Sequence, residues 1–273
     1  PVDQTPTGWT DTQNANLQAL LGLVTGTLTS GRVLTVDPTA GFGDYVTIQA
    51  AIDAAVLAGA SSLTPYVVQV RTGLYTEDVS FEPHVYVMGS PGSPADMTGF
   101  PVVLVRGAHE APMALVGDAT FLSNMTLENV TPSTSATLLK TGLGSLTLFQ
   151  CVLAQGGTNP AQEAALSVTA GSALVVECDV SADPSLNDDR SAITQPSNST
   201  LTIIRSTVTG PTGITLNSTF DTAVTTSITD CTVACTGVGG IGIATDATTF
   251  TLTDSQVSHI ATVPIYVHPG AVG

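Results

Sequence analysis

The chain has 273 residues, of which 10% are charged and 42% are apolar, and its 22 acidic side chains outnumber six Lys and Arg. The net charge of −16 opposes binding to phosphate backbones and to anionic lipid, so we expect no nucleic-acid and no membrane partner. The length suffices for a sizeable core, and no apolar run approaches the ~20 residues of a membrane-spanning helix.

The first predicted element is a helix within residues 12–26, whose apolar residues share one face: Leu17, Leu20, Leu21 and Val24. We assign residues 1–32 to an N-terminal helical segment that serves docking or oligomerisation. A helix folded onto its own chain is the open alternative. Residues 33–273 form the second predicted domain.

A second helix is predicted within residues 45–60, where apolar side chains recur with helical spacing: Ile48, Ala51, Ile52, Ala55 and Val56. Short apolar strands follow at residues 66–70, 85–88 and 102–105. Because the terminal unit of a stacked array must be capped, we expect this helix to cover the first coil.

From residue 120 onward a six-residue phrase recurs, as in LFQCVL (148–153) and VVECDV (175–180). We number its fourth residue position zero, and the six copies place these residues there: Met125, Cys151, Cys178, Ser206, Cys231 and Ser255. The intervals of 24 to 28 residues indicate a solenoid. Alternating Val, Ile, Thr and Leu, without a helix-length apolar stripe, argues against leucine-rich and helical repeats.

The alternation changes phase inside each phrase. Positions −5 and −3 are apolar on one strand face, and positions zero and +2 share a face on the next strand, which requires a bend between them. Position −1 is always polar, as expected of a residue that points outward at a corner: Asn124, Gln150, Glu177, Arg205, Asp230 and Asp254.

A third strand completes each unit, at residues 165–168, 191–194, 213–216, 240–243 and 264–267. Three short strands per coil of about 25 residues predict an all-β fold, a single-stranded right-handed parallel β-helix with an N-terminal capping helix. The position-zero cysteines are then small buried apolar residues with free thiols. The C-terminal residues offer no comparable cap, so we expect that end to contact a partner chain or a loop.

GFGDYVTIQAAIDAA (41–55), VVQVRTGLYTEDVSF (67–81) and VYVMGSPG (85–92) resemble the opening of the pectin methylesterases. The segments 121–132 and 148–156 look like the coils that follow in that family. The resemblance covers roughly residues 33–156 and implies the β-helix fold, which phage tailspikes and other virion proteins also use.

The catalytic residues of that family have no counterparts in this sequence. Cys151 is followed by VLAQGGTNP, without an acid, and Cys178 is followed by DVSADPSLNDDR, without the family's aromatic frame. The sole Trp is Trp9, and no Arg follows Arg205. The resemblance therefore does not extend to ester hydrolysis, which needs two carboxylates and a cation.

Two places were considered for another chemistry, and the first is the outward row of the third strand: Ser167, Thr194, Thr215, Gly242 and Tyr266. None of these is acidic, which argues against a polysaccharide-cleaving cleft there. The second is the corner row, in which Asp230 and Asp254 are expected about 4.8 Å apart at the backbone, near the spacing of a retaining glycosidase. We interpret this row as a charge-balanced stack around Arg205, and the candidate catalytic acids are Glu177, Asp188, Asp230 and Asp254.

The loop 181–190 holds the candidate metal ligands Asp183, Asp188 and Asp189, an oxygen-rich set that suits Ca²⁺. It lacks an EF-hand pattern, and we interpret it as a solvated acidic loop. The four histidines are widely separated in sequence, and no phosphate-binding loop is present. We therefore expect neither a metal nor a cofactor.

Three functions fit these observations. The sequence favours a non-catalytic structural protein of a phage virion: a head-decoration, fibre or baseplate component, assembled in the host cytoplasm as a homotrimer. Its expected partners are other capsid or tail proteins and a surface polysaccharide. The start at Pro1, without the basic and apolar regions of a secretion signal, agrees with this location. The alternatives are a tailspike-like polysaccharide depolymerase, and a secreted bacterial adhesin or carbohydrate-binding module.

Overall fold

A computed structural model describes residues 32–90, 103–106, 113–115, 120–129, 136–155, 164–182, 191–195, 199–216, 224–236, 241–245, 249–259 and 263–267. The predicted N-terminal helix within residues 12–26 lies outside these ranges, as does the acidic loop 183–190. Within the described part no helix is long and apolar enough to cross a membrane.

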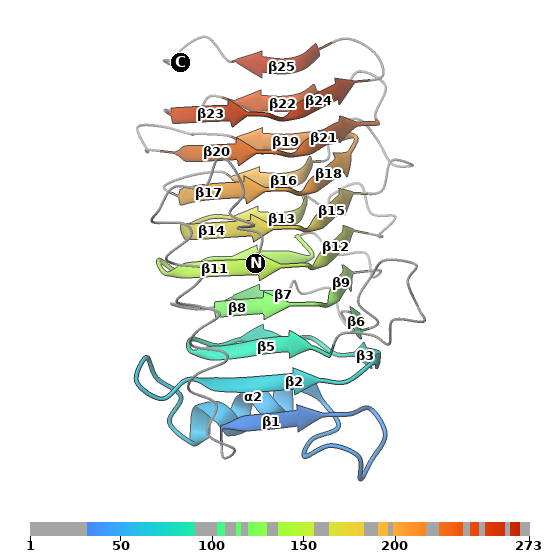
Figure 1. Cartoon of the computed structure of the whole chain (residues 1–273), viewed down its shortest axis with the longest axis vertical. Helices are drawn as coiled ribbons and strands as arrows, with labels where there is room; N and C mark the ends of the chain where they lie inside the picture. The colour runs from blue at the N-terminus through green and yellow to red at the C-terminus, as the bar shows by residue number, and fades with distance from the viewer. Residues whose placement is uncertain are drawn as a thin grey trace, which may run out of the picture.

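The chain winds into a right-handed parallel β-helix with three sheets, stacked coil on coil (Figure 1). Sheet 1 contains, in order, β1 (Val33–Val36), β2 (Tyr66–Val70), β5 (Val85–Gly89), β8 (Thr120–Ser123), β11 (Ser145–Phe149), β14 (Gly171–Val176), β17 (Ser199–Ile204), β20 (Thr225–Thr229) and β23 (Thr249–Thr253). The fold class and its three strands per coil are thus as the sequence predicts.

Sheets 2 and 3 run alongside with eight strands each. Sheet 2 contains β3 (Gly73–Thr76), β6 (Val103–Arg106), β9 (Thr126–Asn129), β12 (Val152–Gln155), β15 (Asp179–Ala182), β18 (Thr207–Gly210), β21 (Thr232–Cys235) and β24 (Gln256–His259). Sheet 3 contains β4 (Ser80–Phe81), β7 (Met113–Leu115), β10 (Leu138–Lys140), β13 (Ala164–Val168), β16 (Ser191–Gln195), β19 (Thr212–Leu216), β22 (Ile241–Thr245) and β25 (Val263–Val267).

The core is a set of rows in which one coil's residue stacks on its equivalent in the next. Leu148 pairs in register with Leu122 and Val175, and all three are fully buried. The position-zero row is interior as predicted: Met125, Cys151, Cys178, Ser206 and Cys231 are buried, and Ser255 in the last coil is half-buried. The four cysteines are free thiols.

The bend before position zero is made by one residue in the left-handed backbone conformation. The six polar corner residues, from Asn124 to Asp254, all have φ between 47° and 54°. A single left-handed residue bends the chain sharply and reverses the alternation, which is the change of phase seen in the sequence. Asn and Asp tolerate this conformation better than branched apolar residues do.

The left-handed corner leaves the position-zero N–H without a place in either sheet, and the next coil supplies its acceptor. The Cys178 N–H donates to Ser206 Oγ (3.1 Å), and the Cys231 N–H donates to Ser255 Oγ (3.1 Å). The Ser206 hydroxyl in turn donates to the Ile204 carbonyl (2.8 Å). The Cys151 N–H donates to Cys178 Sγ in the same way (3.4 Å), so Ser and Cys both serve as acceptors in this row, and treating the cysteines only as small apolar residues is incomplete.

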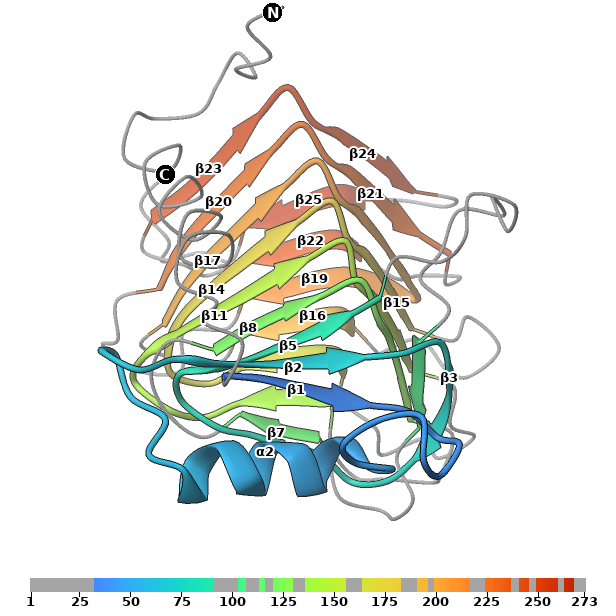
Figure 2. The ribbon, with the colours of Figure 1, turned by 60° about the horizontal axis from the view of Figure 1, so that its bottom comes forward.

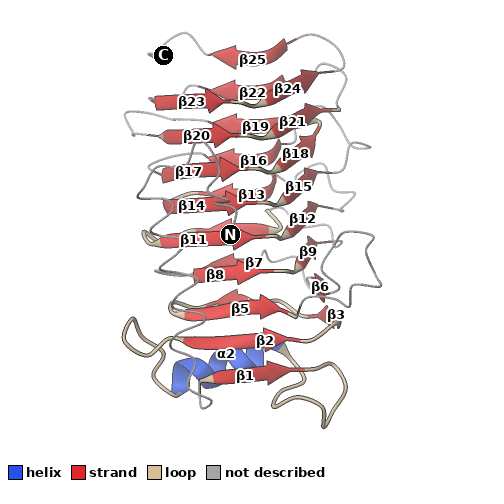
Figure 3. Cartoon of the chain, in the orientation of Figure 1, coloured by secondary structure: helices blue, strands red, loops and turns tan. Residues whose placement is uncertain are grey.

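One helix, α2 (Ile48–Leu57), covers the first coil (Figures 2 and 3). It begins at the N-cap Thr47, whose hydroxyl accepts from the Ala50 N–H. The predicted stripe is buried except for Val56, which is 47% exposed. Val56 lies eight residues after Ile48, about 80° around the helix, at the margin of the buried stripe.

Candidate functional site

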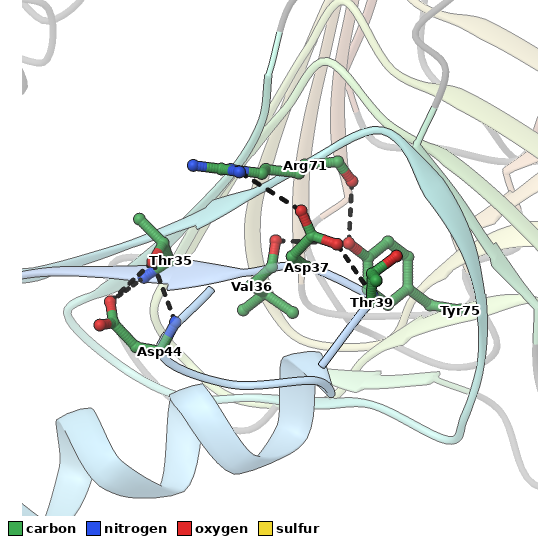
Figure 4. A network of polar contacts seen from close by, with 7 residues as sticks. All are labelled: Thr35, Val36, Asp37, Thr39, Asp44, Arg71 and Tyr75. Atoms are coloured by element: carbon green, nitrogen blue, oxygen red, sulfur yellow. Dashed lines mark hydrogen bonds and ion pairs between the residues drawn. The ribbon is translucent and has the colours of Figure 1, made fainter. Parts of the chain in front are cut away.

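The segments that resemble the pectin methylesterases meet at the capped end, around the network in Figure 4. The Asp44 carboxylate accepts from the Thr35 N–H (2.8 Å) and the Thr35 hydroxyl (2.7 Å), and these bonds, the backbone one first, lower its pKa. The Asp37 carboxylate accepts from the Thr39 N–H (2.8 Å) and lies 3.4 Å from an Arg71 guanidinium nitrogen. Both acids fix the loop between β1 and α2.

Tyr75, the aromatic residue of the phrase GLYTE (73–77) within the segment 67–81, points under the first coil. Its hydroxyl donates to the Arg71 carbonyl (2.9 Å), and its ring is buried. Burial, and then the negative charges of Asp37 and Glu77, raise the pKa of Tyr75 to about 12. Tyr75 therefore stays protonated at neutral pH and serves as a hydrogen-bond donor.

Glu77, the acid of the same phrase, fastens α2 to the first coil. Its two carboxylate oxygens accept from the Ile48 and Gln49 N–H groups at 2.9 Å each, which satisfies two otherwise unpaired donors of the helix N-terminus. The Gln49 side chain accepts from the Ser80 N–H (2.7 Å). Gly73 is required because a Cβ there would lie 2.6 Å from Pro38 Cγ. The residues that carry the resemblance thus build the cap.

The corner row holds three of the predicted catalytic acids. Glu177 Oε1 lies 2.7 Å from an Arg205 guanidinium nitrogen, and Glu177 Oε2 accepts from the Gln150 side-chain amide (2.9 Å). Both oxygens of Glu177 are therefore engaged. Asp230 and Asp254 follow on the next two coils, both exposed at left-handed positions. The Asp230 N–H donates to the Thr253 carbonyl (3.0 Å).

The remaining candidates for catalysis or metal binding, Asp183, Asp188 and Asp189, lie outside the described residues. Among the residues that are described, no group of three or more His, Cys, Asp or Glu is placed to hold a metal ion. Their role stays a prediction from the sequence.

The outward row of sheet 3 differs from the prediction at one position. Thr215 pairs with Ala244, and Ala244 pairs with Tyr266, so Ala244 takes the place assigned to Gly242. The strand that the sequence placed at 240–243 runs from Ile241 to Thr245, because Ile243 stacks on Ile214. Alanine replaces glycine in the row, and the described row still contains no acid.

Two ionisable residues, one half-buried and one fully buried, were missed by the sequence reasoning. Asp179 follows position zero in β15 between Val152 and Thr207, and burial raises its pKa. Lys140 ends β10 in the row of Val168, is fully buried, and donates to the Gly142 carbonyl. The sequence offered one signal for both residues, because each is a charged side chain in a row whose paired neighbours are uncharged. A lone acid with a raised pKa does not make the paired carboxylates of a glycosidase.

The chain was compared with known proteins. No family model matches it, and no curated protein matches it. Two structures of the pectin methylesterase from Aspergillus niger, in deglycosylated forms, are 14% and 13% identical, with TM-scores of 0.50 and 0.51, over 82% of this chain and 85% of theirs. The fold is that of the pectin methylesterases. Pectin methylesterase from carrot is 11% identical over 84% of this chain and 87% of its own, with a TM-score of 0.45.

In this chain Tyr75 and Glu77, from the segment that resembles that family, serve the cap. At this level of identity the likeness concerns the fold alone, and it brings no activity with it.

Proposed function

We propose that this chain is a non-catalytic structural protein of a phage virion: a head-decoration, fibre or baseplate component that assembles as a homotrimer with other capsid or tail proteins. One observation carries the non-catalytic part. Three acids of the described structure, Asp44, Glu77 and Glu177, accept hydrogen bonds or form ion pairs that hold the fold together. None of these three is left available as a general acid or base.

The mechanical properties of the fold support a structural role. Consecutive coils are joined through the three parallel sheets, and position-zero hydrogen bonds add a link from Cys178 to Ser206 and from Cys231 to Ser255, so the stack should resist bending and local opening. Such a rod holds its turns and loops at fixed heights along its length. A surface protein of a particle uses this property to present a face to a host or to a surface polysaccharide.

Immunogold electron microscopy with antibodies against the purified chain tests the virion assignment. We expect gold on phage particles at a fixed position, and sedimentation equilibrium of the purified chain should give the mass of a trimer. Gold on the bacterial cell surface with none on particles would overturn the virion assignment and favour a secreted adhesin.

The depolymerase alternative rests on Asp230 and Asp254, which occupy consecutive corners. Incubation with a panel of acidic bacterial polysaccharides, followed by size-exclusion chromatography, should leave the polymers intact. Chain shortening that disappears in Asp230→Asn or Asp188→Asn, but persists in the surface control Asp53→Asn, would contradict the proposal.

A further inference from the structure

The outer face of sheet 1 is buried where the described chain provides no cover for it. Val67, Tyr86 and Phe121 pair across β2, β5 and β8 and form an apolar cluster separate from the core. Tyr86 and Phe121 meet edge to face, with ring centroids 6.3 Å apart. Further along, Val176 and Ile204 face outward beside the corner. All five side chains are at most 7% exposed.

These residues face away from the interior, because their neighbours Val68, Val175 and Ile203 fill it. Among the described elements, sheets 2 and 3 lie on the inner side, and α2 lies at the foot of the stack (Figures 1 and 2). Stacked neighbours alone leave an outer strand face partly exposed, as at Phe149 and Leu174, which are half-buried. A covering segment is therefore needed over the two buried patches, one on β2 to β8 and one on β14 to β17.

The buried part of the outer face of sheet 1 ends after β17. In the same outward row as Val176 and Ile204, Thr229 is half-buried and Thr253 is exposed. The row also changes from apolar to Thr at that point. The sequence of the sheet thus marks an apolar dock of limited height, between β2 and β17.

We infer that residues 12–26 of the same chain are the occupant, lying across the outer face of sheet 1 with the stripe Leu17, Leu20, Leu21 and Val24 against it. The segment precedes β1, which is the edge strand of this sheet. From β1, β5 is two strand spacings away and β17 is six, about 10 and 29 Å.

The chain outside the described residues has the required reach. Residues 27–31, five residues, span at most about 18 Å when extended. A helix over residues 12–26 adds about 22 Å. Their sum, about 40 Å, exceeds the distance to β17, so the segment reaches the whole dock on its own chain without help from a second copy. Among the internal segments outside the described residues, 91–102 is the longest and therefore the main competitor, but PGSPADMTGFPV carries no periodic apolar stripe.

The test uses thiol labelling of the full-length chain. Ile204→Cys places a reporter inside the dock, and Thr253→Cys places one in the same outward row beyond it. A maleimide should modify the Ile204→Cys chain at least about tenfold more slowly than the Thr253→Cys chain. The native thiols Cys151, Cys178, Cys231 and Cys235 are buried, so modification of one thiol per chain reports local exposure and modification of five reports unfolding.

A pair of matched variants then assigns the occupant. Leu20→Asp with Leu21→Asp puts two charges on the apolar stripe, and we expect the Ile204→Cys reporter to become as reactive as the Thr253→Cys reporter. Ala15→Asp with Ala19→Asp puts the same charges on the opposite helix face and should leave the reporter protected.

Three outcomes would overturn the inference. Continued protection with the charged stripe would exclude residues 12–26, and exposure by Phe100→Asp instead would assign the dock to residues 91–102. Protection that is lost on dilution of the protein would show that the segment comes from a second copy. Protection that is independent of concentration, and lost only with the charged stripe, supports the inference.

Discussion

The two ends of the β-helix complete the core in different ways. At the first coil, Val36 and Val68 are fully buried. Helix α2 lies beneath this coil, and its residue Ile48 is fully buried as well. In the last coil, Leu252 and Val257 are only partly buried, and Ile265 is 36% exposed. An inward residue of a β-helix needs a neighbour on each side along the stack, and the first coil receives one from a helix.

This difference shows which end of the β-helix carries contacts that the repeat itself does not provide. The capped end uses a fixed set of polar contacts, those of Asp44, Tyr75 and Glu77, to hold one element that the repeat cannot supply. The C-terminal coil continues the repeat without such a set among the described residues. Stability should therefore decline toward the last coil, and the following substitutions test that gradient from the largest expected effect to the smallest.

The largest contrast is expected between two leucines at position −3 of sheet 1. Leu148→Ala should lower the free energy of unfolding by about 3 kcal/mol, because it leaves a cavity in a fully buried row. Leu252→Ala, in the same row of the last coil, should cost less than about 1.5 kcal/mol because water already reaches it. Denaturant titration measures both. Equal costs would mean that the last coil is buried as completely as the middle of the stack.

At the capped end, Glu77→Ala should cost about 2 kcal/mol, because two N–H groups of α2 lose their acceptor. Hydrogen exchange should become faster at the Ile48 and Gln49 amides. Glu82→Ala makes the same chemical change five residues later and should stay within about 0.5 kcal/mol of the parent chain. Unchanged exchange in Glu77→Ala would show that α2 is held by its apolar face alone.

The position-zero row gives the next test. Ser206→Ala should cost about 1 to 2 kcal/mol because the buried Cys178 N–H loses its acceptor, whereas Ser206→Cys keeps an acceptor and should cost less. Ser255→Ala, which removes the acceptor of the Cys231 N–H at the half-buried last coil, should also cost less, since water replaces it. A loss in Ser255→Ala as large as in Ser206→Ala would refute the proposed gradient.

The smallest effect is expected at the corner ion pair. Glu177→Gln should lower the free energy of unfolding by less than about 1 kcal/mol, because Glu177 and Arg205 are each about one third exposed. The difference from the parent chain should shrink further in about 1 M salt, where exposed charges are screened. A cost above about 2 kcal/mol that is insensitive to salt would mean that the pair is buried in solution.

Much of the fold could be predicted because the strands and corners of each coil follow from the pattern of neighbouring residues in the repeat. The change of phase before Cys151 and the polar residue Gln150 locate a corner without reference to any other coil. The helical stripe from Ile48 to Ala55 is equally local. The exposure of Val56 could not be predicted locally, because it depends on how much of the helix face the neighbouring coil covers.

Features that depend on distant coils were harder to predict. The acceptor for the Cys178 N–H comes from Ser206, 28 residues later, so the hydrogen-bonding role of the row was not evident. The prediction that Gly242 lies in the outward row of sheet 3 was wrong, because the register with Thr215 depends on loops of unequal length. The pairing of Glu177 with Arg205 was accessible, since adjacent coils share a register, whereas the burial of Lys140 was not.

Two of the three connections in each coil differ in how much their length varies. Sheet 1 is joined to sheet 2 by two residues at each corner from residues 124–125 to 254–255, while the connection from sheet 2 to sheet 3 ranges from one residue (211) to eight (183–190). From residue 124 onward each turn therefore has one corner of fixed length, and the connection from sheet 2 to sheet 3 is free to vary in length. New peptide segments grafted between sheets 2 and 3 would be displayed as rungs at about 4.8 Å intervals, and a whole turn could be duplicated without disturbing those above it.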